Sequence, residues 1–341
     1  MLQKAAAAIA LAAVAAAIPM QAQAQQKHPV NQVVATVSFA FLPVYVAEHA
    51  GYFAAEGVDL KTTTASTAQA GLAAVSSGNA AYYLSTPAAG ARSAAQGAKM
   101  LNCGALLTQN PTNFVVSAEV AKKHGLTNVG AMSVYDRIHL LKGLRIAAHT
   151  AGASPNITLR FMLRQSGINP DTEVQILPLV GNAILAAMEQ KRIDAIAYSS
   201  PLADTAVAKY GAKVLISLAD GDYRPLAGQL SITMVCNKDW AGTEAAAATL
   251  RAIWRGMQLI RTDPVRARAA AKKAFASLED SIFDMAYEIN RKAVPEHPGI
   301  SRAQMEAAID FHHKTGGAPI NVKVEDTYST VAYERAARTM K

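Results

Sequence analysis

The sequence predicts an α/β protein made of two lobes with the same architecture, each a parallel-dominated sheet flanked by helices. At 341 residues the chain exceeds the size that one hydrophobic core usually serves, which favours two lobes. Strand-like apolar runs alternate with helical patterns from residue 32 to residue 218, as βαβ units require. An internal repeat is the third observation, because residues 79–101 and 193–215 are identical at 9 of 23 positions without a gap.

The repeat has two anchors that the alanine-rich composition does not explain. Ser-Thr-Pro at 85–87 matches Ser-Ser-Pro at 199–201, and Gly-Ala-Lys at 97–99 matches the same residues at 211–213. The order of elements upstream repeats too, since Leu42-Pro43 opens a helix in the first half and Ser154-Pro155 opens one in the second. Two lobes built on one plan follow from this repetition.

The first half opens with a strand, a short helix, a turn and a second strand. Pro43 suits the first turn of that helix, because its φ is fixed there and its missing N–H is not needed. Gly51 ends the helix, and Gly57 turns the chain into the next strand. In this half we expect strands at 32–37, 58–64, 79–84 and 98–107, and helices at 43–50, 67–76 and 87–96.

The second half repeats this alternation and then returns to the first lobe. We expect strands at 113–117, 143–149, 173–179, 193–198 and 213–218, and helices at 155–166, 183–190 and 201–209. Residues 109–112 and 220–229 are the predicted crossings, and 230–237 would rejoin the first lobe as a strand. Helices are expected near 241–262, 264–276, 279–293, 302–315 and 326–339. The first lobe then takes residues 25–111 and 230–341, and the second takes 112–229.

Residues 1–24 have the composition of a cleavable export signal. Lys4 is the positive start, residues 5–18 are apolar, and Ala-Gln-Ala at 22–24 suits a signal peptidase. The apolar run is too short to span a bilayer comfortably, so a soluble protein of the periplasm is expected. Removing Lys4 lowers the formal net charge of +8 by one. Such a surface could steer anionic solutes, and it has no basic run typical of nucleic-acid binding.

Several predicted helices begin with residues that can cap them at the carboxyl ends of strands. Ser66 has Gln69 three residues on, and Ser or Thr precedes a first-turn proline at 86–87, 154–155 and 200–201. Asn182 follows Gly181 at another helix start. In an open parallel sheet these helix starts face the cleft where ligands bind. Their free N–H groups suit an anionic head group.

A family resemblance rests on the stretch Leu42 to Leu60, LPVYVAEHAGYFAAEGVDL. This stretch resembles the opening of the solute-binding proteins of nitrate, sulfonate and taurine ABC importers. The resemblance implies a type II periplasmic binding protein fold with two hinge crossings. It also implies a monomer, without metal or cofactor, that captures a small solute and delivers it to permease subunits served by a separate ATPase.

The resemblance also implies which residues contact the ligand. They are the loop after the first strand, the starts of the next helices and the matching positions of the second half: Ser38, Phe39, Ala40, Phe41, Ser66, Thr67, Ser85, Thr86, Thr150, Gly152, Ser154, Asn156, Ser199 and Ser200. Phe39 and Phe41 either stack on an aromatic ligand or pack beneath their loop. His149 ends a strand that faces the predicted cleft, where a lone histidine is more often structural.

The family's usual substrates favour an organic anion such as a sulfonate, a taurine-like compound or a carboxylate. Arg224 in the return crossing is the one arginine at a predicted cleft position. This scarcity of arginine leaves a neutral heteroaromatic ligand, such as a pyrimidine or flavin precursor, as the alternative.

Cys103 and Cys236 are the two cysteines, and both lie in strand-like apolar runs. In two-lobed binding proteins the returning strand often pairs beside the fourth strand of the first lobe, which would bring them near. A disulfide is compatible with export, but two buried thiols are the favoured reading.

The sequence lacks the common enzyme motifs. It has no P-loop, no His-Glu-x-x-His, no Gly-x-Ser-x-Gly and no Cys-x-x-Cys, and His312 and His313 point to different sides of a helix. A yeast-type synthase of the thiamine pyrimidine precursor resembles this family but carries a cysteine-rich motif, which is absent here. We therefore expect a binding protein and not an enzyme. A binding protein that serves a receptor or sensor is the other alternative.

Overall fold

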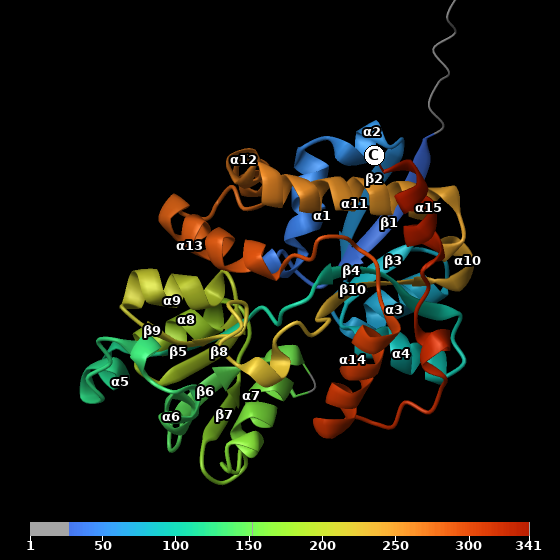
Figure 1. Ribbon diagram of the computed structural model, residues 1–341. Helices are drawn as coiled ribbons and strands as arrows, with labels where there is room; N and C mark the ends of the chain where they lie inside the picture. Colours follow the sequence, from blue (N-terminus) through green and yellow to red (C-terminus); the bar gives the residue numbers. More distant parts are fainter. Residues whose placement is uncertain (1–26, 152, 341) are drawn as a thin grey trace, which may run out of the picture.

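A computed structural model describes residues 27–151 and 153–340 and divides them between two lobes joined by two chain crossings (Figure 1). Lobe I contains a sheet in the order β2-β1-β3-β10-β4, and lobe II contains one in the order β7-β6-β8-β5-β9. The strands of lobe I are β1 (His28–Val34), β2 (Val58–Thr64), β3 (Tyr82–Ser85), β4 (Met100–Leu107) and β10 (Ile232–Asn237). Those of lobe II are β5 (Thr112–Val116), β6 (Arg145–Ala148), β7 (Gln175–Pro178), β8 (Ala195–Ser199) and β9 (Lys213–Ser217).

Each sheet is parallel except for one strand. β10 runs antiparallel to β3 and β4, and β5 runs antiparallel to β8 and β9. Both exceptions are the first strand that the chain forms after crossing from the other lobe. The predicted α/β fold of two lobes with parallel-dominated sheets is confirmed.

The internal repeat corresponds to one structural unit in each lobe. Residues 79–101 contain β3 and α4 (Pro87–Ala95), and residues 193–215 contain β8 and α9 (Leu202–Tyr210). β3 and β8 are both the central strand of their sheets. The matched Ser-x-Pro anchors therefore lie at equivalent positions, at the carboxyl end of the central strand of each sheet.

Helices flank both sheets. Lobe I also has α1 (Leu42–His49), α2 (Tyr52–Ala55) and α3 (Ala68–Ser76), and lobe II has α5 (Ala118–Lys123), α6 (Val134–His139), α7 (Ser154–Gln165) and α8 (Asn182–Glu189). After β10 come α10 (Lys238–Ala241), α11 (Glu244–Thr262), α12 (Pro264–Ala274), α13 (Asp280–Asn290), α14 (Arg302–Lys314) and α15 (Val331–Thr339). Short 3₁₀ turns are η1 (Phe39–Phe41), η2 (Val129–Ala131), η3 (Arg224–Leu226), η4 (Arg291–Ala293) and η5 (Val324–Thr327).

Some predicted elements differ from the structure. The helix expected at 241–262 is two helices, because Thr243 accepts a hydrogen bond from the Ala246 amide at 3.2 Å and starts α11. The helix expected from 326 begins only at Val331, since Tyr328 pairs with Asn102 of β4 in a parallel bridge. Helices α5 and α6 were not predicted, although Ser117 and Ser133 cap them.

The C-terminal helices cover lobe I and also reach lobe II. α11 packs closely on α1, where a Cβ atom on Gly256 would lie 2.6 Å from the carbonyl oxygen of Pro43. α13 contacts α9 of lobe II. Phe311 of α14 meets Phe161 of α7 edge to face, with ring centroids 5.1 Å apart. The C-terminal helices therefore bridge the lobes at two places (Figure 1).

Cys103 and Cys236 form a disulfide between the neighbouring strands β4 and β10, with Cα atoms 6.2 Å apart. This distance lies within the usual range for a bridged pair. The favoured reading of two buried thiols was therefore wrong, although both residues are buried as expected.

The predicted export signal at 1–24 lies outside the described residues. Within residues 27–151 and 153–340, no helix has the length and apolar character needed to span a membrane.

Candidate functional site

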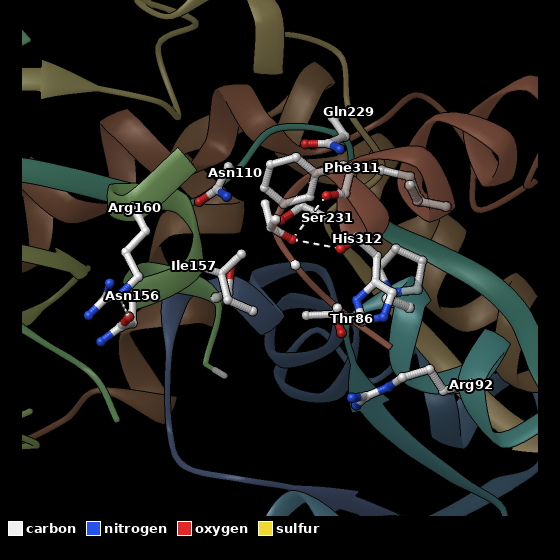
Figure 2. A pocket seen from close by; sticks show the side chains of 18 of the residues that line it. Thr86, Arg92, Asn110, Asn156, Ile157, Arg160, Gln229, Ser231, Phe311 and His312 are labelled. Carbon is white, nitrogen blue, oxygen red and sulfur yellow. Dashed lines mark hydrogen bonds between the residues drawn. The ribbon is translucent and has the colours of Figure 1, made fainter. Parts of the chain in front are cut away.

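A pocket of about 300 Å³ lies between the lobes. Its walls come from α4 of lobe I, α7 of lobe II, both crossings and α14 (Figure 2). The lining residues are Thr86, Pro87, Ala88, Arg92, Asn110, Ala151, Ser154, Asn156, Ile157, Arg160, Arg164, Gln229, Leu230, Ser231, Ala308, Phe311, His312, Thr315, Gly316 and Gly317. The volume is at the small end of the range typical of ligand pockets.

The structure brings three of the predicted ligand residues together in this pocket: Thr86, Ser154 and Asn156. Thr86 is the N-cap residue of α4, and its hydroxyl makes no capping hydrogen bond. The amide nitrogen of Asn156 donates to the carbonyl oxygen of His149 at 2.8 Å, which ties the start of α7 to the end of β6. Two helix starts, one from each lobe, therefore face one pocket.

Three arginines line the pocket, and the sequence reasoning missed all of them: Arg92, Arg160 and Arg164. A signal existed, because Arg92 and Arg160 each follow, by five residues, the proline near the start of their helix. Such a position lies in the second turn of the helix, still close to the carboxyl edge of the sheet. Arg224, the expected cleft arginine, is instead exposed in η3 and does not line the pocket.

The arginines differ in how they are neutralised. Asp171 pairs with Arg160, and one of its oxygens lies 3.8 Å from Arg164 Nη2. The hydrogen bond from Arg160 lowers the pKa of Asp171, so this carboxylate is charged at neutral pH. Arg160 Nε also donates to Asn156 Oδ1 at 3.1 Å. Among residues 27–151 and 153–340, Arg92 has no ion-pair partner, and no Asp or Glu lines the pocket.

His312 completes one wall of the pocket. Its Nε2 lies 3.0 Å from the carbonyl oxygen of Ala318, an acceptor, so this nitrogen carries the proton. Burial lowers the pKa of His312, and the positive charge of Arg92 acts in the same direction. His312 is therefore neutral at pH 7.

The loop after β1 is packed into the protein. Ser38, Phe39, Ala40 and Phe41 are all buried, and Ser38 Oγ accepts from the Ala40 amide at 3.2 Å. Phe39 has no exposed surface and stacks on Phe275 of α12 with ring centroids 4.1 Å apart. The structure thus favours packing over ligand stacking for Phe39.

The start of α3 differs from the predicted capping box. Thr67, and not Ser66, is the N-cap residue, because its hydroxyl accepts from the Ala70 amide at 3.1 Å. Ser66 and Thr67 are exposed, and Ser85 is partly buried at the end of β3. These three residues do not line the pocket.

At the carboxyl edge of lobe II, His149 and Tyr198 stack with ring centroids 5.7 Å apart. The amide of Thr150 donates to His149 Nδ1 at 2.8 Å, and burial lowers the pKa of this histidine. Thr150 is exposed and Ser199 is partly buried, while Gly152 lies outside the described residues.

Ser200 is not a helix cap. Pro201 is the N-cap residue of α9, and Ser200 is buried, with its hydroxyl accepting from Asn290 Nδ2 of α13 at 2.7 Å. The Ser-Pro pair that resembles the helix starts at 86 and 154 is therefore used for a contact between the lobes.

Solved structures with a similar fold include the periplasmic aliphatic sulphonate binding protein SsuA from Escherichia coli. The two structures superimpose with a TM-score of 0.67 and 16% sequence identity, and the match covers 90% of this chain and 100% of that one. The alkanesulfonate-binding protein SsuA from Xanthomonas axonopodis pv. citri, bound to MOPS, has a TM-score of 0.66 and 15% sequence identity. The match covers 89% of this chain and 99% of that one. The periplasmic nitrate-binding protein NrtA from Synechocystis PCC 6803 has a TM-score of 0.68 and 11% sequence identity, and the match covers 92% of this chain and 89% of that one.

At these identities the likeness establishes the fold alone. A comparison with curated proteins gives no match. The sequence profile of the family described as NMT1/THI5 like, in contrast, matches residues 38–267, which is more than half of the chain. The protein therefore has the two-lobed periplasmic binding protein fold and belongs to the NMT1/THI5-like family.

Proposed function

We propose that this protein is the periplasmic solute-binding component of an ABC importer and that it binds a small organic anion between its lobes. In this role the loaded protein delivers its ligand to membrane permease subunits, and a separate subunit hydrolyses ATP. The SsuA and NrtA structures support the proposal, since their names state that they bind sulfonates and nitrate.

The charge of the pocket is the observation that carries this proposal. Arg92, Arg160 and Arg164 line it, and no carboxylate among the described residues does. Apolar surface from Ile157 and Phe311 lies between these charges, which suits an organic body. The arginines favour an anion over a neutral heteroaromatic ligand, because a guanidinium makes strong charge-assisted hydrogen bonds to carboxylate or sulfonate oxygens.

A thermal-shift screen tests the proposal. Residues 25–341 are unfolded, refolded to remove bound ligand, and mixed with sulfonates, carboxylates, nitrate, pyrimidines and flavins. A ligand at 100 times its Kd adds about 2.7 kcal/mol of stability, which is roughly several degrees for a protein of this size. We expect the shift with sulfonates or carboxylates. A shift with pyrimidines or flavins alone would contradict the proposed ligand class.

Two arginine variants show where the anion binds. Arg92→Gln removes the unpaired charge in the pocket, and Arg224→Gln removes an exposed arginine of the return crossing as the matched control. We expect Arg92→Gln to weaken the anion about 10-fold or more and Arg224→Gln to leave its affinity nearly unchanged. The opposite result would favour Arg224 as the residue that holds the anion.

A further inference from the structure

The net charge of the interlobe pocket narrows the ligand class further. On the lobe II side, Arg160 and Arg164 share Asp171 as their one carboxylate partner within residues 27–151 and 153–340, which leaves one uncompensated positive charge. On the lobe I side, the positive charge of Arg92 is uncompensated. His312 adds nothing, because its buried ring is neutral. The lining therefore presents two positive charges that the described residues do not balance.

These two charges lie on opposite sides of the pocket. Figure 2 shows Arg92 on α4 at one side and Arg160 on α7 at the other, with Thr86 and Ile157 between them. A single anionic group that contacts one side leaves the other side without a counter-ion. Apolar side chains, among them Phe311, Ala308 and Leu230, also line the pocket.

We propose that the ligand is a small organic dianion with an apolar middle, and that its two charged ends bind Arg92 of lobe I and the Arg160–Arg164 pair of lobe II. This inference rests on the proposed function and specifies its substrate class. Charge-assisted hydrogen bonds from guanidinium to carboxylate or sulfonate are strong, and each end would make them with a different lobe. The dianion thereby supplies a counter-charge to each lobe, which a monoanion cannot do.

Calorimetric titration of the stripped protein with matched pairs of ligands tests this inference. Hexanoate and adipate have the same chain length with one and two carboxylates, and benzoate and terephthalate form an aromatic pair. In the wild type we expect the dianion of at least one pair to bind about 10- to 100-fold more tightly than its monoanion. The preference should fall as salt is added, because the contacts are ionic.

For each variant we compare the same ratio, the affinity for the dianion divided by the affinity for its matched monoanion. Arg92→Gln and Arg160→Gln should each reduce the ratio to about twofold or less, since one of the two charges is then missing. Arg92→Lys keeps the charge and should retain most of the ratio, and Arg224→Gln is the unchanged control. Arg92 is exposed, so its replacement should leave the melting temperature of the free protein unchanged.

The possible failures are distinct. If monoanions bind as tightly as their matched dianions, the dianion inference is wrong and the proposed anion-binding function stands. If the dianion preference survives both Arg92→Gln and Arg160→Gln, the assignment of its two ends is wrong. If no anion of either kind binds to the folded protein, the proposed function itself fails.

Discussion

Asn290 of lobe I donates a 2.7 Å hydrogen bond from its side-chain amide to the hydroxyl of Ser200 in lobe II, and both residues are buried. Ser200 also hydrogen-bonds the carboxylate of Asp204 in the first turn of α9. Two partly exposed ion pairs, Lys209–Glu279 and Lys292–Asp220, also join the two lobes. A polar network shielded from water thus joins the lobes along α9 and α13.

The first prediction concerns this network. Asn290→Ala removes the donor to Ser200 and leaves buried polar atoms without a partner, so we expect a loss of about 1–3 kcal/mol in the free energy of unfolding. Urea unfolding measures the loss. Asn31→Ala is the control, because Asn31 is exposed and its side-chain amide donates to the Asn79 carbonyl oxygen in its own lobe. Equal stabilities for the two variants would contradict a role for Asn290 between the lobes.

The second prediction concerns the pH dependence that Asp204 imposes. Burial raises the pKa of Asp204 to about 6 from its ordinary value of 3.8, although the hydrogen bond from Ser200 opposes this. The folded state therefore holds the proton more tightly than the unfolded state between these two values. This tighter proton binding by Asp204 stabilises the folded state fully below pH 3.8, and the stabilisation is lost as pH rises through about 6.

Asp204→Asn removes this loss. At pH 7.5 the variant should be more stable than the wild type by up to about 3 kcal/mol, and the difference should shrink towards pH 4. Thermal unfolding between pH 4 and pH 7.5 measures both effects. Asp326→Asn changes an exposed carboxylate instead, and we expect it to alter stability by less than about 0.5 kcal/mol. A destabilised Asp204→Asn variant at pH 7.5 would show that the charged form is preferred.

The fold was predictable because its evidence is local or symmetric. The alternation of strands and helices depends on short-range periodicity, and the repeat of 79–101 at 193–215 places the same unit in both lobes. Helix starts at Thr86 and Ser154 were also readable from a cap residue followed by proline. Where two caps stood side by side, as at Ser66 and Thr67, local patterns did not distinguish them.

The site was less predictable because its chemistry depends on distant partners. Phe39 packs on Phe275, which lies more than 200 residues later in the chain. Arg92 and Arg160 share a pocket only because the crossings bring α4 and α7 together across the two lobes. The Ser200-Pro201 pair looked like another helix start, but its partner Asn290 belongs to the other lobe.

The third prediction concerns the disulfide between Cys103 and Cys236, which closes a loop across a sequence separation of 133 residues. By the chain-entropy argument a loop of this length contributes about 4–5 kcal/mol, mainly by restricting the unfolded chain. Reduction should therefore lower the melting temperature, as should replacing both residues by Ala. The reductant should not change the melting temperature of that double variant, which serves as the control. An unchanged melting temperature for reduced wild type would contradict the stabilising role.

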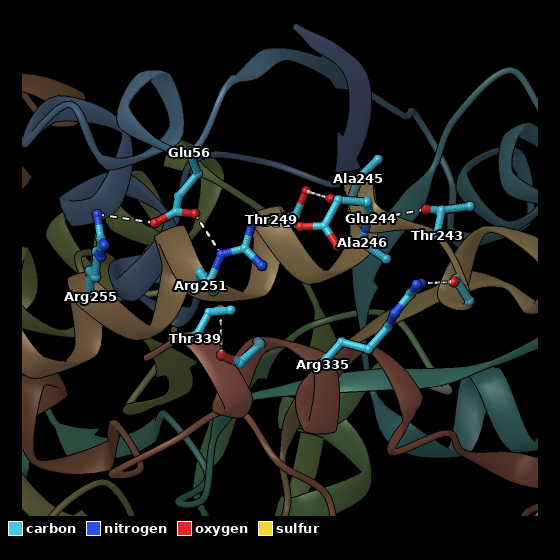
Figure 3. Close-up of polar contacts among 12 residues, drawn as sticks. Glu56, Thr243, Glu244, Ala245, Ala246, Thr249, Arg251, Arg255, Arg335 and Thr339 are labelled. Carbon is cyan, nitrogen blue, oxygen red and sulfur yellow. Dashed lines mark hydrogen bonds and ion pairs between the residues drawn. The ribbon is translucent and has the colours of Figure 1, made fainter. Parts of the chain in front are cut away.

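The fourth prediction concerns Glu56, in the Gly-Tyr-Phe-Ala-Ala-Glu-Gly stretch that carries the family resemblance. Its carboxylate accepts from Arg251 Nε at 2.6 Å and lies 3.0 Å from Arg255 Nη1, which fastens the turn after α2 to α11 (Figure 3). The side chains of Glu56 and Arg251 are only 9% and 13% exposed, so water screens this pair weakly.

Glu56→Gln keeps the shape of the side chain and removes its charge. Of the described carboxylates that pair with Arg251, Glu244 then remains, 2.8 Å away and half exposed. We expect the free energy of unfolding to fall by about 2–3 kcal/mol, because a largely buried guanidinium loses its main partner. Glu244→Gln is the matched control, since it removes the exposed partner of the same arginine, and it should cost less than about 1 kcal/mol. Thermal unfolding of both variants measures the difference. If Glu244→Gln proved the more damaging, the carboxylate that holds Arg251 would be the exposed one, and the turn after α2 would depend on apolar packing alone.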